Sequence, residues 1–302
     1  MDIEGRRRSS NFEDRGRGSG GGGGGLPVGA LMSVARLLGF KGVLMVGAVL
    51  GVGYFLLPSE IKQQVLGGLQ GSGQGTQGSG SVCQASPRNG KACDFSRVVL
   101  ASTEDVWTAQ FQKGALPRYA SPPSAYQEPS LVVFADGVAT GGCGNASSAV
   151  GPFYCPRDKK LYIDPGFYDV MDQRLKAPGD FAQAYVIAHE VGHHVQNLIG
   201  ATDVRVKGET QNQVSVRVEL QADCFAGVWG HTARASLEIT DDDLKEAVNA
   251  AHAIGDDTLG HSSSDDYTHG TSAQRMRWFR RGFESGDARQ CDTFGVANYG
   301  EL

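Results

Sequence analysis

The sequence predicts an α+β domain, mostly helical with a small sheet, that follows a single N-terminal transmembrane helix. Three observations lead to this prediction. Glycine-rich tracts isolate an apolar run near the N-terminus, two short runs of β-branched and aromatic residues lie mid-chain, and four segments with helical spacing fill the second half. The net charge of −5 argues against a nucleic-acid-binding protein, so we expect peptides or small molecules as partners.

The N-terminal region contains stretches with too little apolar surface to fold. Residues 16–25 and 67–81 are rich in glycine, so we interpret residues 1–36 as a disordered Gly/Arg-rich segment and residues 58–81 as a Gly/Ser/Gln-rich linker. Residues 37–57 are almost uncharged and long enough to cross a bilayer of about 30 Å. A buried core helix would have nothing to pack against here, and a cleaved signal peptide usually has a shorter polar start.

Charge and cysteine distribution predict how the chain is placed. Six arginines precede the apolar run, Lys41 lies near its start, and only Lys62 follows it closely. The positive-inside rule therefore predicts a single-pass protein of the cytoplasmic membrane, with a cytoplasmic N-terminus and residues 82–302 extracytoplasmic or periplasmic. All six cysteines lie on that outer side, which indicates disulfides. Sequence proximity favours Cys83–Cys93 and Cys143–Cys155, with Cys224–Cys291 as the remainder; other pairings are possible, and buried free thiols are the alternative for the last pair.

Residues 82–302 have the apolar content of one good-sized domain. The run "VVLASTEDVWTAQFQKG" has helical spacing with Thr103 as a possible N-cap, whereas "SLVVFADG" and "KKLYIDP" are typical of strands. An exposed edge on the second strand could pair with an extended peptide, and an ordinary sheet strand is the equal alternative. Further helices are expected over Asp180–Ile199, Thr210–Arg234, Asp241–Ile254 and Ser272–Gly286.

The stretch "AHEVGHHVQN" contains three of the seven histidines, in the pattern His-Glu-x-x-His. At about 100° per residue, His189 and His193 lie about 40° apart on a helix, so both rings can reach one ion. Glu190 stands beside them as a carboxylate base that can take a proton from zinc-bound water. His194 lies about 140° from His189 and is expected to bond elsewhere. The motif predicts a catalytic Zn²⁺ site.

A catalytic zinc needs a third protein ligand, and the next predicted helix offers one in "ELQAD". Glu219 follows His193 with enough chain between them for a turn and a return. Asp223 lies four residues further on the same face, where it can accept the second ring N–H of a ligand histidine. Two acidic residues at this spacing usually lie on a solvent-exposed helix face. Here the pair follows the histidine motif and has apolar neighbours, so we expect it to belong to the helix that supplies the third ligand.

These motifs resemble a known family. "AHEVGHHVQ", "ELQADCFAG", "THGTSAQRMRWF", "GPFYCPRDKKLYIDPGFYD" and the N-terminal "EGRRRSSNFEDRG" look like the bacterial putative neutral zinc metallopeptidases, which are membrane-anchored and gluzincin-like. The resemblance covers nearly the whole chain apart from its glycine tracts. It implies a zincin-like domain, zinc, the ligands His189, His193 and Glu219, the base Glu190 and peptide-bond hydrolysis.

Hydrolysis also requires a donor for the oxyanion that forms when water attacks the carbonyl. His269 precedes the last helix and could supply it; the neighbouring Tyr267 is a second candidate, and a purely structural role for His269 is the alternative. Arg275 either pairs with a carboxylate of the active helices or lies on the surface. Three other histidines have no partner at ligand spacing: His231, His252 and His261.

The sequence therefore predicts a membrane-anchored zinc endopeptidase that acts on peptide or protein substrates. A non-catalytic zinc scaffold or peptide-binding module would use the same three ligands. Glu190 favours the enzyme, because a structural site has little need for a carboxylate beside the metal.

Overall fold

The computed structural model describes residues 1–18, 80–119, 125–260 and 263–302. The predicted transmembrane helix at 37–57, and all but the last residues of the predicted linker at 58–81, lie outside these ranges. Among the helices of the described ranges, none is both long and apolar enough to cross a membrane.

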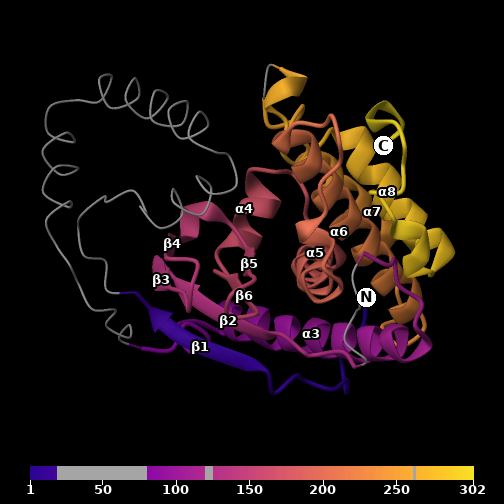
Figure 1. The fold of residues 1–302 in the computed structure, drawn as a ribbon. Helices are drawn as coiled ribbons and strands as arrows, with labels where there is room; N and C mark the ends of the chain where they lie inside the picture. The colour runs from indigo at the N-terminus through magenta and orange to yellow at the C-terminus, as the bar shows by residue number, and fades with distance from the viewer. Residues whose placement is uncertain (19–79, 120–124, 261–262) are drawn as a thin grey trace, which may run out of the picture.

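The structure is a mixed α/β fold, about half helical, with a small sheet at one side (Figure 1). The sheet has four strands in the order β1-β2-β6-β5, and its bounds are β1 Phe12–Arg17, β2 Ser130–Ala135, β6 Lys160–Ile163 and β5 Phe153–Cys155. β1, β2 and β6 are parallel, whereas β5 runs antiparallel to β6. A ribbon of β3 (Gly137–Ala139) and β4 (Asn145–Ser147) adjoins it.

Both predicted strands form, and of the two equal alternatives for the second strand the structure shows the ordinary interior strand and not the exposed edge. The "KKLYIDP" strand, β6, lies between β2 and β5 and is buried over Leu161–Ile163. The short strand β5, which the sequence reading did not identify, pairs with β6 and takes the edge position. On this side of the sheet, pairing with an extended peptide therefore falls to β5, and β1 is the edge strand on the other side.

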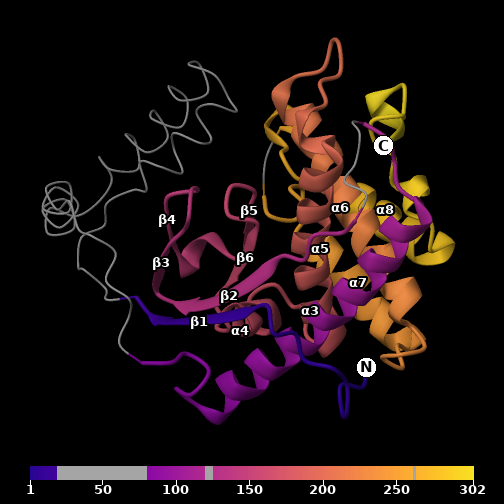
Figure 2. The same cartoon turned by 60° about the horizontal axis from the view of Figure 1, so that its bottom comes forward.

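The described ranges contain six α-helices, and α3 runs from the sheet to the helical layer (Figures 1 and 2). The α5 bounds match the prediction, and its C-cap Gly200 is left-handed with φ 75°. Thr103 does not start a helix: α3 begins after the N-cap Ser86, and Thr103 is buried inside it. The helix bounds are α3 Pro87–Lys113, α4 Phe167–Gln173, α5 Asp180–Ile199, α6 Gln211–Ala233, α7 Asp241–Ala253 and α8 Ser272–Ser285.

The N-terminal residues belong to the domain, so the interpretation of residues 1–36 as disordered is wrong over residues 1–17. β1 pairs in register with β2, from Phe12 opposite Leu131. Arg7 and Ser9 both bond the carboxylate of Glu104, which is only 1% exposed, inside α3. A buried carboxylate needs such partners, so this segment completes the packing around α3.

Asp14 connects the chain before residue 19 to the chain after residue 79. Its carboxylate accepts hydrogen bonds from Ser81 Oγ at 2.6 Å and from the amides of Val82 and Cys83, both at 3.0 Å. The chain therefore leaves β1 and returns toward α3 at one corner of the domain.

All three predicted disulfides are present: Cys83–Cys93, Cys143–Cys155 and Cys224–Cys291. The first fixes the start of α3, the second closes the β3–β5 region, and the third links α6 to the segment after α8. These links hold the loops around a core built mainly between α3, α5, α6 and α8.

Candidate metal centre and cleft

Close packing of α5 on α6 brings the metal-binding side chains together. Gly192 lies between the two histidines of the motif, and a Cβ added there would stand 3.0 Å from the Ala222 carbonyl oxygen of α6. Such a contact is tighter than almost all Cβ contacts, so a side chain here would push the two helices apart by a few tenths of an ångström. Gly192 therefore sets the distance at which Glu219 can reach across to α5.

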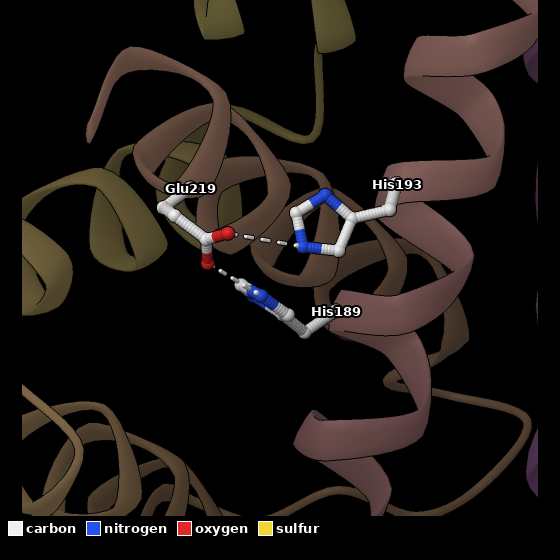
Figure 3. Close-up of side chains that lie close together, drawn as sticks. All are labelled: His189, His193 and Glu219. Atoms are coloured by element: carbon white, nitrogen blue, oxygen red, sulfur yellow. Dashed lines mark ion pairs between the residues drawn. The ribbon is translucent and has the colours of Figure 1, made fainter. Parts of the chain in front are cut away.

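His189, His193 and Glu219 converge from these two helices, as Figure 3 shows. Glu219 Oε2 is 3.2 Å from His189 Nε2, and Glu219 Oε1 is 3.5 Å from His193 Nε2. One ligand atom from each residue lies within 4.8 Å of the other two. The structure thus places the three predicted ligands around one point.

The donor set fits zinc better than a harder cation. Two neutral imidazole nitrogens and one carboxylate oxygen are the ligands of many catalytic zinc sites, whereas Mg²⁺ and Ca²⁺ prefer oxygen alone. Without a metal charge, burial of the His189 ring disfavours its cation, but the Asp223 and Glu219 carboxylates outweigh this and raise its pKa to about 10. The negative potential of these two carboxylates, which favours a protonated His189, would equally favour a divalent cation beside the ring.

A second acidic cluster is occupied by a cation of the chain itself. Asp180, Asp243 and Glu246 are close enough to hold an ion. The α-ammonium group of Met1 is 3.0 Å from Asp243 Oδ1 and 3.7 Å from Asp180 Oδ2. This cluster therefore carries no argument for a second metal.

Asp223 orients His189, as the sequence predicts. Its Oδ1 accepts a hydrogen bond from His189 Nδ1 at 2.8 Å, which leaves Nε2 free to face the metal position. Tyr185 donates to the same oxygen at 2.5 Å. Burial disfavours the Asp223 carboxylate, but Arg275 and His189 lower its pKa below the ordinary value. Asp223 therefore stays ionised in the interior.

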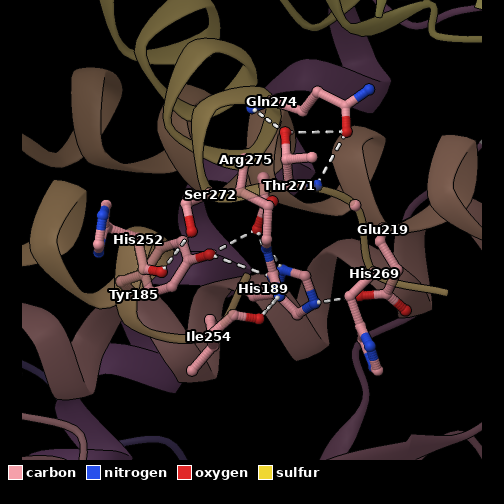
Figure 4. A network of polar contacts seen from close by, with 12 residues as sticks. Tyr185, His189, Glu219, His252, Ile254, His269, Thr271, Ser272, Gln274 and Arg275 are labelled. Atoms are coloured by element: carbon pink, nitrogen blue, oxygen red, sulfur yellow. Dashed lines mark hydrogen bonds and ion pairs between the residues drawn. The ribbon is translucent and has the colours of Figure 1, made fainter. Parts of the chain in front are cut away.

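Arg275 is part of this network and not a surface residue. It is 2% exposed and reaches from α8 to Asp223, beside Tyr185 and His189 (Figure 4). Glycines on both helices allow this reach: a Cβ on Gly227 of α6 would lie 2.1 Å from the Phe279 carbonyl oxygen of α8. Close packing of α6 on α8 thus supports the α5–α6 metal centre.

His193 is oriented by a residue that the sequence reading missed. Its Nδ1 bonds Gln196 Oε1 at 2.8 Å, and the Gln196 amide in turn donates to the Val218 carbonyl at 2.6 Å. Gln196 is fully buried. In the sequence, the signal for this contact is the spacing of three residues, which places the side chains of His193 and Gln196 on one helix face.

His194 points away from the metal centre, as its position on the helix predicts. Its Nδ1 accepts from Tyr154 Oη at 2.9 Å, and its Nε2 donates to the Gln127 carbonyl at 2.5 Å. Burial lowers the pKa of the ring to about 4, so it is neutral at pH 7. His194 thus fastens α5 to β5 and to the segment before β2.

Glu190 is 9% exposed and lines the same cavity as the metal ligands. Burial raises the pKa of its carboxyl above the ordinary value. A carboxylate with a raised pKa accepts protons more readily, so Glu190 has the position and basicity of a general base.

Of the two candidate oxyanion donors, only His269 reaches this cavity. Its ring lies beside Glu219 in Figure 4 and lines the cavity, whereas Tyr267 does not. His269 Nδ1 is 3.1 Å from Asp256 Oδ1, and Asp256 also accepts the His269 backbone N–H at 2.7 Å. The Asp256 hydrogen bond raises the pKa of His269, so the protonated ring, which has a second N–H to donate, persists to higher pH than in an ordinary histidine.

Two of the remaining histidines, His231 and His252, lie away from the three candidate ligands. His231 Nδ1 bonds the Phe283 carbonyl at 2.6 Å, and His252 lies on a separate groove of α7 and α8. His261 lies outside the described residues.

The cavity beside the metal ligands has a volume of about 420 Å³, enough for part of a peptide. One wall comes from α5 and α6, and another from Gly151 to Tyr154, which includes the start of the edge strand β5. The three candidate ligands, Glu190 and His269 thus line a single cleft at the edge of the sheet.

Comparison with known proteins agrees with this geometry. A family model described as "Putative neutral zinc metallopeptidase" matches residues 1–294. The chain belongs to this metallopeptidase family. Because the match starts at residue 1, the family pattern includes the N-terminal segment that carries β1.

The chain is also similar in sequence to individual bacterial proteins. The chain is 46% identical to "Uncharacterized protein YpfJ" of Escherichia coli K12 over 307 residues, which cover 98% of this chain and 99% of that protein. It is 43% identical to "Uncharacterized protein Rv2575" of Mycobacterium tuberculosis H37Rv over 192 residues, which cover 58% of this chain and 65% of that protein. No solved structure gives a significant match. The metallopeptidase family assignment therefore rests on sequence, and the centre's chemistry on its geometry.

Proposed function

We propose that the chain is a zinc-dependent endopeptidase that hydrolyses peptide bonds, with His189, His193 and Glu219 as the ligands of Zn²⁺. The observation that carries the proposal is the position of Glu190, a buried carboxylate that faces the same cleft as the three ligand atoms. When bound, zinc would supply a Lewis acid that lowers the pKa of water and polarises a carbonyl group.

The residues of the chain have separate roles in the reaction. Glu190 takes the proton from the attacking water and passes it to the leaving amine. His269, held by Asp256, donates a hydrogen bond to the oxyanion that develops on the carbonyl oxygen. Asp223 and Gln196 keep the two imidazoles in the tautomer that presents Nε2 to the metal.

The edge strand β5 offers a way to bind the peptide backbone. It borders the cleft through Phe153 and Tyr154, and its outer edge has no further strand in the described sheet. An extended substrate segment would pair there, so we expect unstructured peptides and flexible loops to be cleaved in preference to folded proteins.

A non-catalytic zinc scaffold remains the competing proposal, and Glu190 decides between them. Replacement of Glu190 by Gln removes the base but keeps the shape of the site. We expect wild-type protein loaded with zinc to cleave an unstructured peptide library, and Glu190→Gln to bind one zinc while losing at least about 100-fold in kcat. Equal turnover by both proteins, with contaminants excluded, would contradict the proposed mechanism, and no turnover by either would favour the scaffold.

We place the domain in an oxidising compartment, in line with the sequence-based expectation of an extracytoplasmic or periplasmic domain. The support is its three disulfides, which persist outside the cytoplasm and are rare within it.

A further inference from the structure

The cleft has two halves of different character. Its ionisable side chains, apart from two tyrosines, belong to the metal centre and its immediate partners. The other half is apolar and comes from α4, the loop after it, and the end of α7. We call this half the apolar compartment and define it by Phe167, Met171, Leu175 and Ile254.

The compartment is continuous with the hydrophobic core. Met171 is 2% exposed and belongs to the core, and Phe167, Leu175 and Ile254 are partly buried side chains packed against it. These three side chains keep part of their apolar surface uncovered inside the cleft. An apolar group that entered here would extend the core, gaining about 25 cal/mol for each Å² removed from water.

The rim of the same cleft carries exposed apolar side chains on both sides. Val150 is 58% exposed and Leu259 is 50% exposed, and they are the large hydrophobic residues that stand out to solvent in the described part of the chain. Val150 precedes β5, whereas Leu259 follows α7, and both line the cleft. Exposed apolar residues at the rim of a cleft are typical of a binding site.

We propose that the apolar compartment binds a bulky aliphatic or aromatic side chain of a residue flanking the scissile bond, and that Val150 and Leu259 close over it. This inference rests on the proposed peptidase function and specifies its substrates. A side chain in the compartment lies next to Glu190 and the metal ligands, because one cavity holds them all. It thereby positions the neighbouring peptide bond for attack.

The same surface disfavours charge. Among the residues that the structure describes, no lysine or aspartate lines the cleft, and its glutamates and its arginine lie in the metal half. A charged substrate side chain in the apolar compartment would lose its water without gaining a partner. We expect kcat/KM for Leu or Phe at this substrate position to exceed that for Asp or Lys by at least about 100-fold, since even one methylene is worth about 10–200-fold.

The test uses an unstructured peptide library in which the residues around the cleavage point vary, with mass spectrometry to locate the cut. Preferential cleavage beside Leu, Phe, Met or Ile is expected. Cleavage without any such preference overturns the apolar-compartment proposal but leaves the peptidase function intact. No cleavage at all, with zinc bound, overturns the peptidase function, and with it the inference that rests on it.

Variants on α7 and at its C-cap separate a role in specificity from a role in folding. Ile254→Lys introduces a cation into the compartment, while the Ile254 backbone keeps its hydrogen bond to Arg275. Val248→Lys is the matched control, because Val248 is also partly buried but lines a different groove. We expect Ile254→Lys to lose at least about 10-fold in kcat/KM for apolar peptides and to gain activity on acidic ones. Val248→Lys should keep the wild-type preference.

A binding measurement gives a readout that does not depend on turnover. In the Glu190→Gln background, peptides with Leu at the preferred position should bind more tightly than their Asp counterparts, as measured by fluorescence anisotropy. Addition of Ile254→Lys should remove or reverse that difference. If Ile254→Lys binds both peptides as its parent does, the compartment does not contact the side chain and the proposal fails.

Discussion

Arg275 pairs with Asp223 through two contacts, with Nε 2.8 Å from one carboxylate oxygen and Nη2 2.9 Å from the other. Both side chains are almost completely buried, with exposures of 2% and 0%. The same carboxylate orients His189, so the ion pair connects α8 to the metal centre. Removal of one charge would leave the other buried without its main partner.

Arg275→Met is therefore expected to lower the free energy of unfolding by about 3–5 kcal/mol. Arg280→Met is the control, because Arg280 is an exposed arginine on the same helix. It should change stability by less than about 0.5 kcal/mol. Urea unfolding at pH 7 measures both. Similar values for the two variants would show that the buried pair contributes nothing beyond a surface arginine.

Zinc binding should distinguish Glu219 from His194. Glu219→Gln removes a ligand oxygen charge, so zinc affinity should fall by more than about 100-fold, beyond the range of about 10–100-fold typical of outer partners. His194→Ala should still bind one zinc, because His194 bonds Tyr154 and Gln127 instead. Its effect should be a loss of about 1–3 kcal/mol in stability, from polar groups left without a partner.

Metal analysis after dialysis, together with competition against a chelating dye, measures these affinities. Loss of zinc in His194→Ala with retention in Glu219→Gln would reverse the ligand assignment.

His269 should affect turnover and leave zinc binding unchanged. His269→Ala removes the donor that faces the cleft, and loss of one oxyanion donor typically costs about 10²–10³-fold in kcat. Tyr267→Phe should have wild-type activity, because Tyr267 does not line the cleft. Steady-state kinetics with equal zinc occupancy tests both. A larger loss for Tyr267→Phe than for His269→Ala would transfer the role to the tyrosine.

Asp14 should make the attachment of the N-terminal segment dependent on pH. Partial burial disfavours the charged carboxylate, but the hydrogen bonds from Ser81, Cys83 and Val82 lower its pKa below the ordinary value. A lowered pKa means that the carboxylate contributes stability above an unfolded pKa of about 3.9. This contribution is lost as the pH falls through the lower folded value.

Asp14→Asn should therefore be less stable than wild type at pH 7, by about 1 kcal/mol. This is below the range of about 1.5–3 kcal/mol for hydrogen bonds to charged groups, because Asp14 is only partly shielded from solvent. The difference should shrink at pH 3. Unfolding curves across this pH range measure it, with Asp242→Asn as an exposed control. A difference that stays constant with pH would mean that the charge of Asp14 is not what matters.

The elements that sequence alone predicted are those with local signals. The α5 helix has helical spacing and a terminal Gly200, and its His-Glu-x-x-His pattern fixes which side chains share a face. The capping box of Thr240 and Asp243 at the start of α7, a helix that the sequence predicts, is a local signal of the same kind. Such signals depend on neighbours within one or two helical turns.

The elements that were missed depend on distant contacts. β1 has the polar sequence "FEDRGR", and its partner strand begins at Ser130, so nothing nearby in the chain reveals the pairing. The first half of α3, "PRNGKACDFSR", is also polar, and it is stabilised by the Ser86 cap and by the Cys83–Cys93 disulfide. In the centre, the role of Gln196 required knowledge of how closely α5 packs on α6.

The hydrogen bonds of Asp14 to residues 81–83 constrain how this protein could be oriented at a membrane. Residues 1–18 and the metal centre belong to one folded body, with β1 hydrogen-bonded to β2 and Asp14 bonded to residues 81–83. A lipid bilayer cannot pass between two hydrogen-bonded strands. The topology inferred from charge, with a cytoplasmic N-terminus and an external domain, and the pairing of β1 with β2 therefore make opposite predictions. A cysteine placed at exposed Gly5 would report which holds in cells, since the fold requires an impermeant thiol reagent to reach it from the same side as the cleft that His189, His193 and Glu219 line.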